Sequence, residues 1–169
     1  GANAGTGITG ANNTAIGFLS NGTSTVSSGS YHTTLGYQSG GQLTTGGGNV
    51  LIGSYANNAG TGFSTGNNNI AISSDYWYTG VTTGSNNTLV GNIRGLSAND
   101  SNLIILADGS QNVAIRKEAD NRLLAPTLTN ALIDSGGAKS LVTKEYLEVH
   151  SGDSASTLDQ VLAHGNTAI

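Results

Sequence analysis

A short pattern of polar and apolar positions recurs along the first two-thirds of the chain. Two or three small polar residues are followed by two or three apolar residues and then, in most cases, by a glycine. The pattern occurs at 12–17, 31–36, 48–53, 68–73 and 86–91. Between the last apolar residues of successive occurrences, the steps are 19, 17, 20 and 18 residues. A near-constant period predicts one small structural unit stacked along an axis.

Each occurrence predicts a strand of about three to five residues that turns at once, because β-branched and aliphatic residues are followed directly by glycine. Paired asparagines such as Asn12-Asn13 and Asn86-Asn87 precede the strands. Asparagine tolerates positive φ and bonds to nearby backbone, so these pairs are expected at corners between strands. Stretches rich in Thr and Ser, such as 42–45 and 81–83, predict a return strand in each coil.

The predicted coil contains few large side chains for a core. We expect one or two per coil, for example Ile16 with Phe18, or Leu35 with Tyr37. Burial of a large side chain stabilises by about 1.5–3 kcal/mol, whereas ordering the backbone costs about 1–2 kcal/mol per residue. A single narrow array of such coils would be marginal, which favours association of several chains.

Composition and charge agree with a thin repetitive fold. Gly, Ser, Thr and Asn make up about half of the 169 residues, and the net charge is only -4. There is no Asp, Glu, Lys or Arg from Gly1 to Ser74, and only Asp75 and Arg94 occur before residue 99. We therefore expect no nucleic-acid partner, since phosphate neutralisation needs Lys and Arg. We expect no membrane insertion either, because no apolar run approaches the length of a transmembrane helix.

The final third has a different pattern. Two apolar runs, 103–106 and 112–115, flank the turn signal Asp108-Gly109 and predict a hairpin whose strands replace the long coils after Val90. Two short helices are expected further on, at 143–149 and 156–165. These features divide the chain into a repeat array at 1–98, a short-strand transition at 99–125 and a connector at 126–169. The phrase at 165–169 repeats the start of the earlier ones, so a further module is expected downstream.

The repeats at 13–17, 49–53 and 112–115 resemble those in the heads of trimeric autotransporter adhesins. The stretch 31–40, Tyr-His-Thr-Thr-Leu-Gly-Tyr-Gln-Ser-Gly, is similar to repeats of bacteriophage tail fibres and related appendage proteins. The stretches 141–147 and 158–162 resemble connectors in phage tail fibres. The resemblance implies an all-β fold: a trimeric β-roll or β-solenoid-like repeat array, then short strands and one or two short C-terminal helices. The period here is longer and less regular than in the adhesins.

Candidate chemistry is concentrated in one segment, Asp75, Tyr76, Trp77 and Tyr78. It holds the sole Trp and the first charge. Aromatic faces beside an acid and hydroxyls suit carbohydrate, so the segment is a candidate receptor-binding site. The alternative is that Trp77 fills the trimer core or a gap between coils.

Catalytic and metal-binding residues are not evident. A glycosidase needs two carboxylates about 5–9.5 Å apart, and the array supplies only Asp75 before Asp100. A pair would have to be assembled across subunits from Asp75, Asp100 and Asp108. The three His residues lack ligand spacing, and without Cys there is neither a disulfide nor a zinc-finger motif. We expect no catalytic residue, no metal site and no cofactor.

The sequence therefore predicts a structural fibre module of a phage virion appendage, a spacer that also takes part in host-surface attachment without catalysis. Its expected partners are two further copies in a homotrimer, other virion proteins at the termini and a glycan or protein of the host surface. The expected location is the virion, on a tail or capsid appendage that faces the exterior. The alternatives are the head of a bacterial trimeric adhesin that binds host matrix, and a glycan-degrading phage spike.

Overall fold

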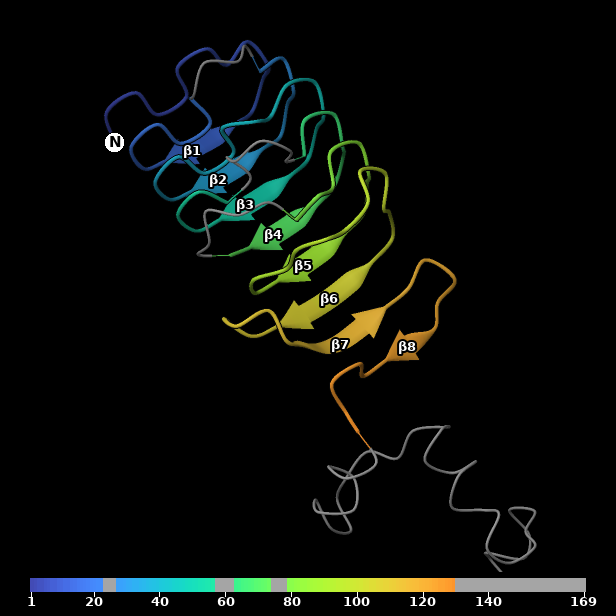
Figure 1. Cartoon of the computed structure of the whole chain (residues 1–169). Helices are drawn as coiled ribbons and strands as arrows, with labels where there is room; N and C mark the ends of the chain where they lie inside the picture. The colour runs from blue at the N-terminus through green and yellow to red at the C-terminus, as the bar shows by residue number, and fades with distance from the viewer. Residues whose placement is uncertain (23–26, 57–62, 74–78, 130–169) are drawn as a thin grey trace, which may run out of the picture. The chain divides into compact units, whose positions relative to one another are not determined.

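The computed structural model describes residues 1–22, 27–56, 63–73 and 79–129. The chain divides into two compact units, Gly1–Thr127 and Leu128–Ile169, and all the described strands lie in the first (Figure 1). The described residues contain strands and no helix, so the predicted all-β class is confirmed; the two expected C-terminal helices lie outside the described residues. The strands are β1 (Thr14–Ile16), β2 (Thr33–Leu35), β3 (Val50–Ile52), β4 (Ile70–Ile72), β5 (Thr88–Val90), β6 (Ile104–Ala107), β7 (Val113–Lys117) and β8 (Leu123–Leu124).

Strands β1 to β6 form a β-solenoid. Each pairs in parallel with the next one along the chain, and the connection between two strands makes one turn around the axis (Figure 1). The repeats align without slippage: Thr14 pairs with Thr33, Thr33 with Val50 and Val50 with Ile70. The predicted stack of small units is therefore confirmed.

The end of the stack combines two kinds of pairing. Strand β6 pairs in parallel with β5 and antiparallel with β7, and β7 pairs antiparallel with β8. The hairpin predicted around Asp108-Gly109 is confirmed. Hairpin strands do not simply replace the coils after Val90, however, because β6 is both the last strand of the stack and the first strand of the hairpin.

Two columns of glycine allow the coils to stack. One precedes the strands and one follows them, and a Cβ atom in either column would collide with the carbonyl oxygen of the next coil. Gly53, for example, has a φ of +125° and faces the Ser73 carbonyl. The columns are Gly10, Gly29, Gly46, Gly66 and Gly84 before the strands, and Gly17, Gly36, Gly53 and Gly91 after them. The turn signals in the sequence are thus positions of close backbone approach.

A ladder of buried amides runs along the inside of the corner before each strand. Asn69 donates its side-chain N–H groups to Asn49 Oδ1 at 3.1 Å and to the Gly84 carbonyl at 3.0 Å. Asn87 repeats this with Asn69 Oδ1 at 3.0 Å and the Asp100 carbonyl at 2.8 Å. All three asparagines are fully buried. In each asparagine pair before a strand, the first residue has the positive φ expected at a corner: Asn12, Asn68 and Asn86 have φ of 55–62°. The expected corner role is thus confirmed for these residues.

In the described residues, the wall opposite the strands does not contain the return strand predicted at 42–45 and 81–83. In the coil that begins at Thr44, three consecutive backbone N–H groups, those of residues 44, 45 and 46, donate to the single carbonyl of Ser64 at 2.9–3.4 Å. Residues 64–66 do the same with Thr82, and residues 82–84 with Ala98. A strand would instead spread its donors over alternating partners. Hydrogen bonds still join the coils here, but the backbone turns rather than extends.

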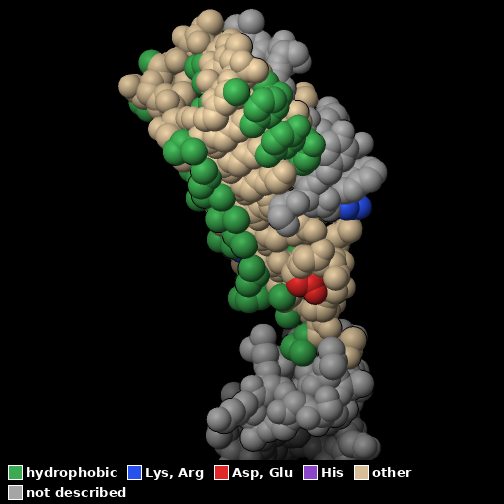
Figure 2. All heavy atoms as spheres, turned by 90° about the vertical axis from the view of Figure 1, so that its left-hand side faces the viewer, with side chains coloured by type: hydrophobic (Ala, Val, Ile, Leu, Met, Phe, Trp, Pro, Cys, Tyr) green, Lys and Arg blue, Asp and Glu red, His purple; other side chains and the backbone are tan. Residues whose placement is uncertain are grey.

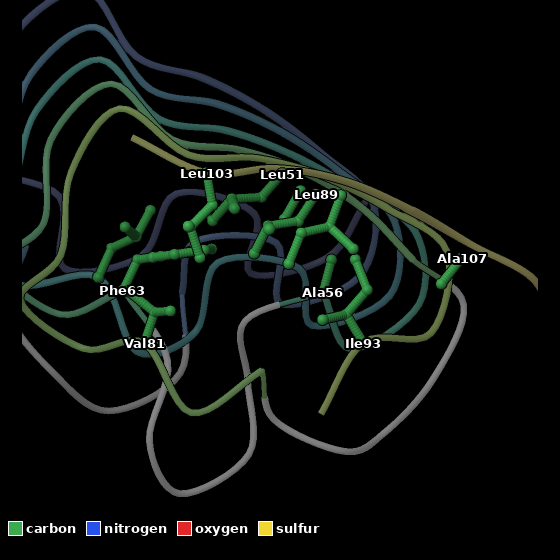
Figure 3. Close-up of a cluster of buried hydrophobic side chains, with 11 residues drawn as sticks. Leu51, Ala56, Phe63, Val81, Leu89, Ile93, Leu103 and Ala107 are labelled. Atoms are coloured by element: carbon green, nitrogen blue, oxygen red, sulfur yellow. The ribbon is translucent and has the colours of Figure 1, made fainter. Parts of the chain in front are cut away.

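The hydrophobic core begins only in the third coil. It comprises Leu43, Leu51, Ala56, Phe63, Ala71, Val81, Leu89, Ile93, Leu103, Ile105 and Ala107 (Figure 3). The interior of the first two coils is polar: Ser20 and Thr34 are fully buried, and Ser20 Oγ donates to Thr34 Oγ1 at 2.8 Å. Hydrogen bonds thus replace apolar packing at the N-terminal end.

The side chains predicted for the core are exposed. Ile16 is 55% exposed, Phe18 and Leu35 are each 43% exposed, and Tyr37 is 42% exposed. In a three-residue strand only the middle side chain points inward, because successive side chains alternate. The middle residue of β2 is Thr34, whereas Leu35 points outward. The expectation that the largest residue of each phrase fills the coil was wrong.

Candidate functional site

The outer face of the sheet carries a continuous row of aliphatic side chains. The row contains one residue from each of seven neighbouring strands, in register: Ile16, Leu35, Ile52, Ile72, Val90, Leu106 and Ile115. With strands about 4.7–4.9 Å apart, the row is roughly 30 Å long. Figure 2 shows hydrophobic side chains in a stripe that runs down the strands. We call these seven residues the apolar row.

The neighbouring positions on the same face are also uncharged over six strands. They carry either hydroxyl or aliphatic side chains: Thr14, Thr33, Val50, Ile70, Thr88 and Ile104. The first charge in this line is Lys117 of β7, which pairs with Ile104. A contiguous exposed apolar patch of this extent is typical of an interaction surface.

A shallow groove of about 400 Å³ lies beside the apolar row in the later coils. It is lined by Ile52, Ile72 and Val90 of the row and by Gly53, Ser73, Gly91, Asn92 and Gly109. Gly53 and Gly91 leave the exits of β3 and β5 without side chains, and the exit of β4 carries only the small Ser73, which makes room for the groove. The exit side of the later coils is therefore hollow and mostly apolar.

Aromatic residues follow the strand exits of the first three coils: Phe18 and Tyr37 come directly after the exit glycine, and Tyr55 one residue later. Phe18 stacks on Tyr37 with ring centroids 5.5 Å apart and an angle of 13° between planes. Tyr37 meets Tyr55 edge to face, with centroids 5.0 Å apart. We call Phe18, Tyr37 and Tyr55 the aromatic ladder. Its contacts contribute about 0.5–1.5 kcal/mol each beyond burial. The interior is polar in the first two of the three coils that carry the ladder.

One further aromatic residue lies at the opposite end of the strands. Tyr31 directly precedes His32 at the corner before β2; it has a φ of 63° and is 68% exposed. The equivalent residues of the other coils are asparagine or glycine: Asn12, Gly48, Asn68, Asn86 and Asn102. These types adopt positive φ readily, whereas a tyrosine there costs about 1–2 kcal/mol. In the single chain, burial of the ring does not offset this cost.

His32 occupies the position that asparagine holds in the neighbouring coils. Its Nδ1 accepts the backbone N–H of Asn49 at 3.2 Å, and its Nε2 is buried without a hydrogen-bond partner among the described residues. Burial lowers the pKa of His32 below the ordinary value of 6.5, and interactions with the backbone of Gly46 and Asn49 oppose this in part. The imidazole is therefore neutral near pH 7 and belongs to the interior.

The candidate receptor-binding residues Asp75, Tyr76, Trp77 and Tyr78 lie outside the described residues, so that hypothesis stays a prediction. The other carboxylates considered for catalysis hold turns. Asp108 accepts the backbone N–H groups of Ser110 and Asn112 at 2.8 and 2.9 Å. A hydrogen bond from the Asn112 side chain is the main reason why the pKa of Asp108 is lowered. Asp100 accepts the N–H of Ser97 at 2.9 Å.

The described part of the chain holds no group of three or more His, Asp or Glu that could bind a metal ion. Among the same residues, no helix is long and apolar enough to cross a bilayer.

The apolar row was not predicted, although the sequence contained a signal for it. The third residue of each strand phrase is always aliphatic, while the second varies among Ala, Thr and Leu. The more regular position is the outward one. Regular hydrophobicity therefore marked the surface of the coil rather than its interior.

Comparisons with known proteins found no matching family model, no matching curated protein and no matching solved structure. The class that the fold itself defines is a β-solenoid with an uncharged outer sheet face.

Proposed function

We propose that this chain is a structural module of a bacteriophage tail fibre or a related virion appendage. It works as a parallel homotrimer, lengthens the fibre, takes part in host-surface attachment and carries out no catalysis. The observation that supports this best is the apolar row along seven strands of the outer sheet face. The resemblance of the repeats to phage fibres and trimeric adhesin heads suggests the biological setting and the number of chains in the assembly, which is three.

Association accounts for the apolar row in energetic terms. Burying the exposed half of an aliphatic side chain contributes roughly 1 kcal/mol. Ile16, Leu35 and Ile72 are 55%, 43% and 40% exposed in the single chain. Three copies around an axis parallel to the solenoid cover all three rows at once, and a closed symmetric ring leaves none of them open.

The low charge of the array suits a spacer. Its coils are joined by backbone hydrogen bonds and by the buried asparagine ladder, which do not depend on ionic strength in the way that exposed ion pairs do. Such a module keeps its length and shape in varied external media.

Light scattering on the full chain tests the association. We expect a mass three times the 16.9 kDa of one chain. The variant Leu35→Lys/Ile72→Lys places charges on the apolar row and is expected to be monomeric. The control Thr45→Lys/Thr65→Lys adds the same charge at two exposed positions of the opposite wall and should stay trimeric. A monomeric wild type, or equal behaviour of both variants, would contradict the proposal.

Binding assays test whether the chain belongs to a phage appendage, an adhesin head or a glycan-degrading spike. Labelled protein is expected to bind intact bacterial cells and to leave host polysaccharide unhydrolysed. Binding only to animal matrix proteins would favour an adhesin head, and release of reducing ends would favour a degrading spike. A glycan array with wild type and Trp77→Ala tests recognition at residues 75–78, where equal binding by both would refute that site.

A further inference from the structure

We infer that, in the trimer, Tyr31 of each copy packs against the aromatic ladder of the next copy, and that this contact sets the axial register of the three chains. The inference rests on the proposed function, because it names the side chains that meet between copies. It starts from the unusual position of Tyr31.

The Tyr31 ring does not contribute to the backbone conformation of the corner where it lies. Asparagine or glycine at this corner allows the same backbone in the other coils. The ring is 68% exposed, more than Phe18 or Tyr37. Positive φ occurs at other large residues too, such as Leu19 and Tyr55. Tyr31 differs from them because its side chain is mostly exposed at a corner that holds asparagine or glycine in the other coils, and a contact with another molecule explains this best.

Threefold symmetry determines which parts of two copies meet. All six strands of the solenoid run in one direction and lie across its axis. When the sheet face points to a threefold axis parallel to the solenoid, the entry ends of the strands in one copy face the exit ends in the next. This contact is heterologous, so the two surfaces can differ.

Aromatic residues lie at both ends of the same strand. Tyr31 precedes β2 and Tyr37 follows it, so the symmetry brings these two residues of adjacent copies to the same level. Phe18 and Tyr55 stand one coil away on either side. Phe18 and Tyr37 are 43% and 42% exposed and thus have surface left for a further ring. Figure 2 shows a second group of hydrophobic side chains beside the stripe, at the N-terminal coils.

The later coils lack this pairing. Their entry corners carry Gly48, Asn68 and Asn86, so even Tyr55, which follows β3, has no aromatic residue at the entry corner of its own coil. The apolar row alone would tolerate a shift of one copy by one coil, because each step presents another aliphatic residue. A single level with aromatic residues on both sides selects one register.

Cysteine cross-linking of the full chain tests the contact, since the natural sequence has no Cys. The variant Tyr31→Cys/Tyr37→Cys should give covalent trimers on non-reducing gels after mild oxidation. The two positions within one chain are separated by β2, about 10 Å of extended strand, beyond the ~7 Å limit between Cα atoms for a disulfide. The control Tyr31→Cys/Asn92→Cys uses the equivalent exit position three coils further on and should give no covalent trimer.

The outcomes separate this inference from the proposed function. A trimer by light scattering that does not cross-link through 31 and 37, or that cross-links equally through 31 and 92, overturns the contact and leaves the trimer. A monomer overturns the proposed function as well.

A second variant gives an independent measurement. Tyr31→Asn restores the residue of the other coils, so the chain should fold, as circular dichroism can check. Its trimer should dissociate at concentrations at least tenfold higher in sedimentation equilibrium. An unchanged or tighter trimer would contradict the inference.

Discussion

The coils before Leu43 and the coils after it share one backbone plan but place their large side chains differently. Before Leu43 the interior is polar, with Ser20 and Thr34 joined by hydrogen bonds, and the aromatic rings are outside. After Leu43 the interior is apolar, and beyond Tyr55, which follows β3, the strand exits open into the groove. The difference teaches that the glycine columns and backbone pairing define the coil, while the stabilising side chains can lie on either side of it.

The largest effect is expected from deleting a core side chain. Leu89→Ala should lower the free energy of unfolding by about 2–5 kcal/mol, because Leu89 is fully buried in the apolar interior. The equivalent change in the polar coils, Thr34→Ala, should cost about 1 kcal/mol, since one hydrogen-bonded hydroxyl is removed. Urea unfolding followed by circular dichroism measures both. Equal losses would mean that the two interiors do not differ as described.

A somewhat smaller loss is expected from breaking the amide ladder. Asn69→Ala removes the acceptor of the Asn87 N–H groups and the donor to the Gly84 carbonyl. Two or three buried groups lose a partner, which should cost about 2–4 kcal/mol in thermal or urea unfolding. The control Thr65→Ala, four residues away and exposed, should change stability by less than about 0.5 kcal/mol. A neutral Asn69→Ala would show that the ladder is not a source of stability.

The third prediction concerns pH and the N-terminal coils. The pKa of His32 is lower in the folded chain than its ordinary value of 6.5, so the unfolded chain binds more protons between the two values. Stability should therefore fall as pH drops below about 6.5 and level off below the folded pKa. His32→Asn, which restores the residue of the neighbouring coils, should remove this loss. Melting temperatures at pH 7.5 and 5.0 measure it, and identical pH profiles of the two proteins would refute it.

Asp108 and Asp120, the two described carboxylates with lowered pKa values, act in a different pH range from His32. Hydrogen bonds from Asn112 and Arg122 lower the pKa values of Asp108 and Asp120, respectively, from their ordinary value of 3.8. Their contribution to stability is thus lost only when pH falls below that value, outside the window of His32.

The smallest effect on the free energy of unfolding should come from replacing the polar pair Ser20 and Thr34 inside the first two coils with apolar residues. Ser20→Ala alone removes the donor to Thr34 and should cost about 1 kcal/mol. Ser20→Ala/Thr34→Val removes both partners of that hydrogen bond with little change of volume, so it should change unfolding by less than about 0.5 kcal/mol. A double-mutant cycle in urea measures the coupling. Additive losses would show that the two hydroxyls act separately.

The sequence allowed the stacked repeats and their turns to be predicted. The repeat period can be read directly along the chain, and glycine and asparagine favour turns through their own backbone conformation. It did not allow the two sides of a coil to be told apart. Ile16 and Leu35 were assigned to the core by their size, but a three-residue strand points only its middle residue inward. The apolar row depends on how neighbouring strands align across connections of unequal length. The sequence of a single coil does not specify that alignment. Likewise, the apolar run Leu103–Leu106 predicted a strand. It did not predict that this strand pairs in parallel with β5 and antiparallel with β7.

The spacing between the two glycine columns has a consequence for how such a chain can vary. Gly29 and Gly36, Gly46 and Gly53, and Gly84 and Gly91 are each seven positions apart, and all differences in coil length fall in the arc that follows the second glycine. The coil thus acts as a display scaffold with a fixed side and an adjustable side. Foreign peptides inserted between Ala56 and Phe63 should leave the pairing of β3 and β4 intact.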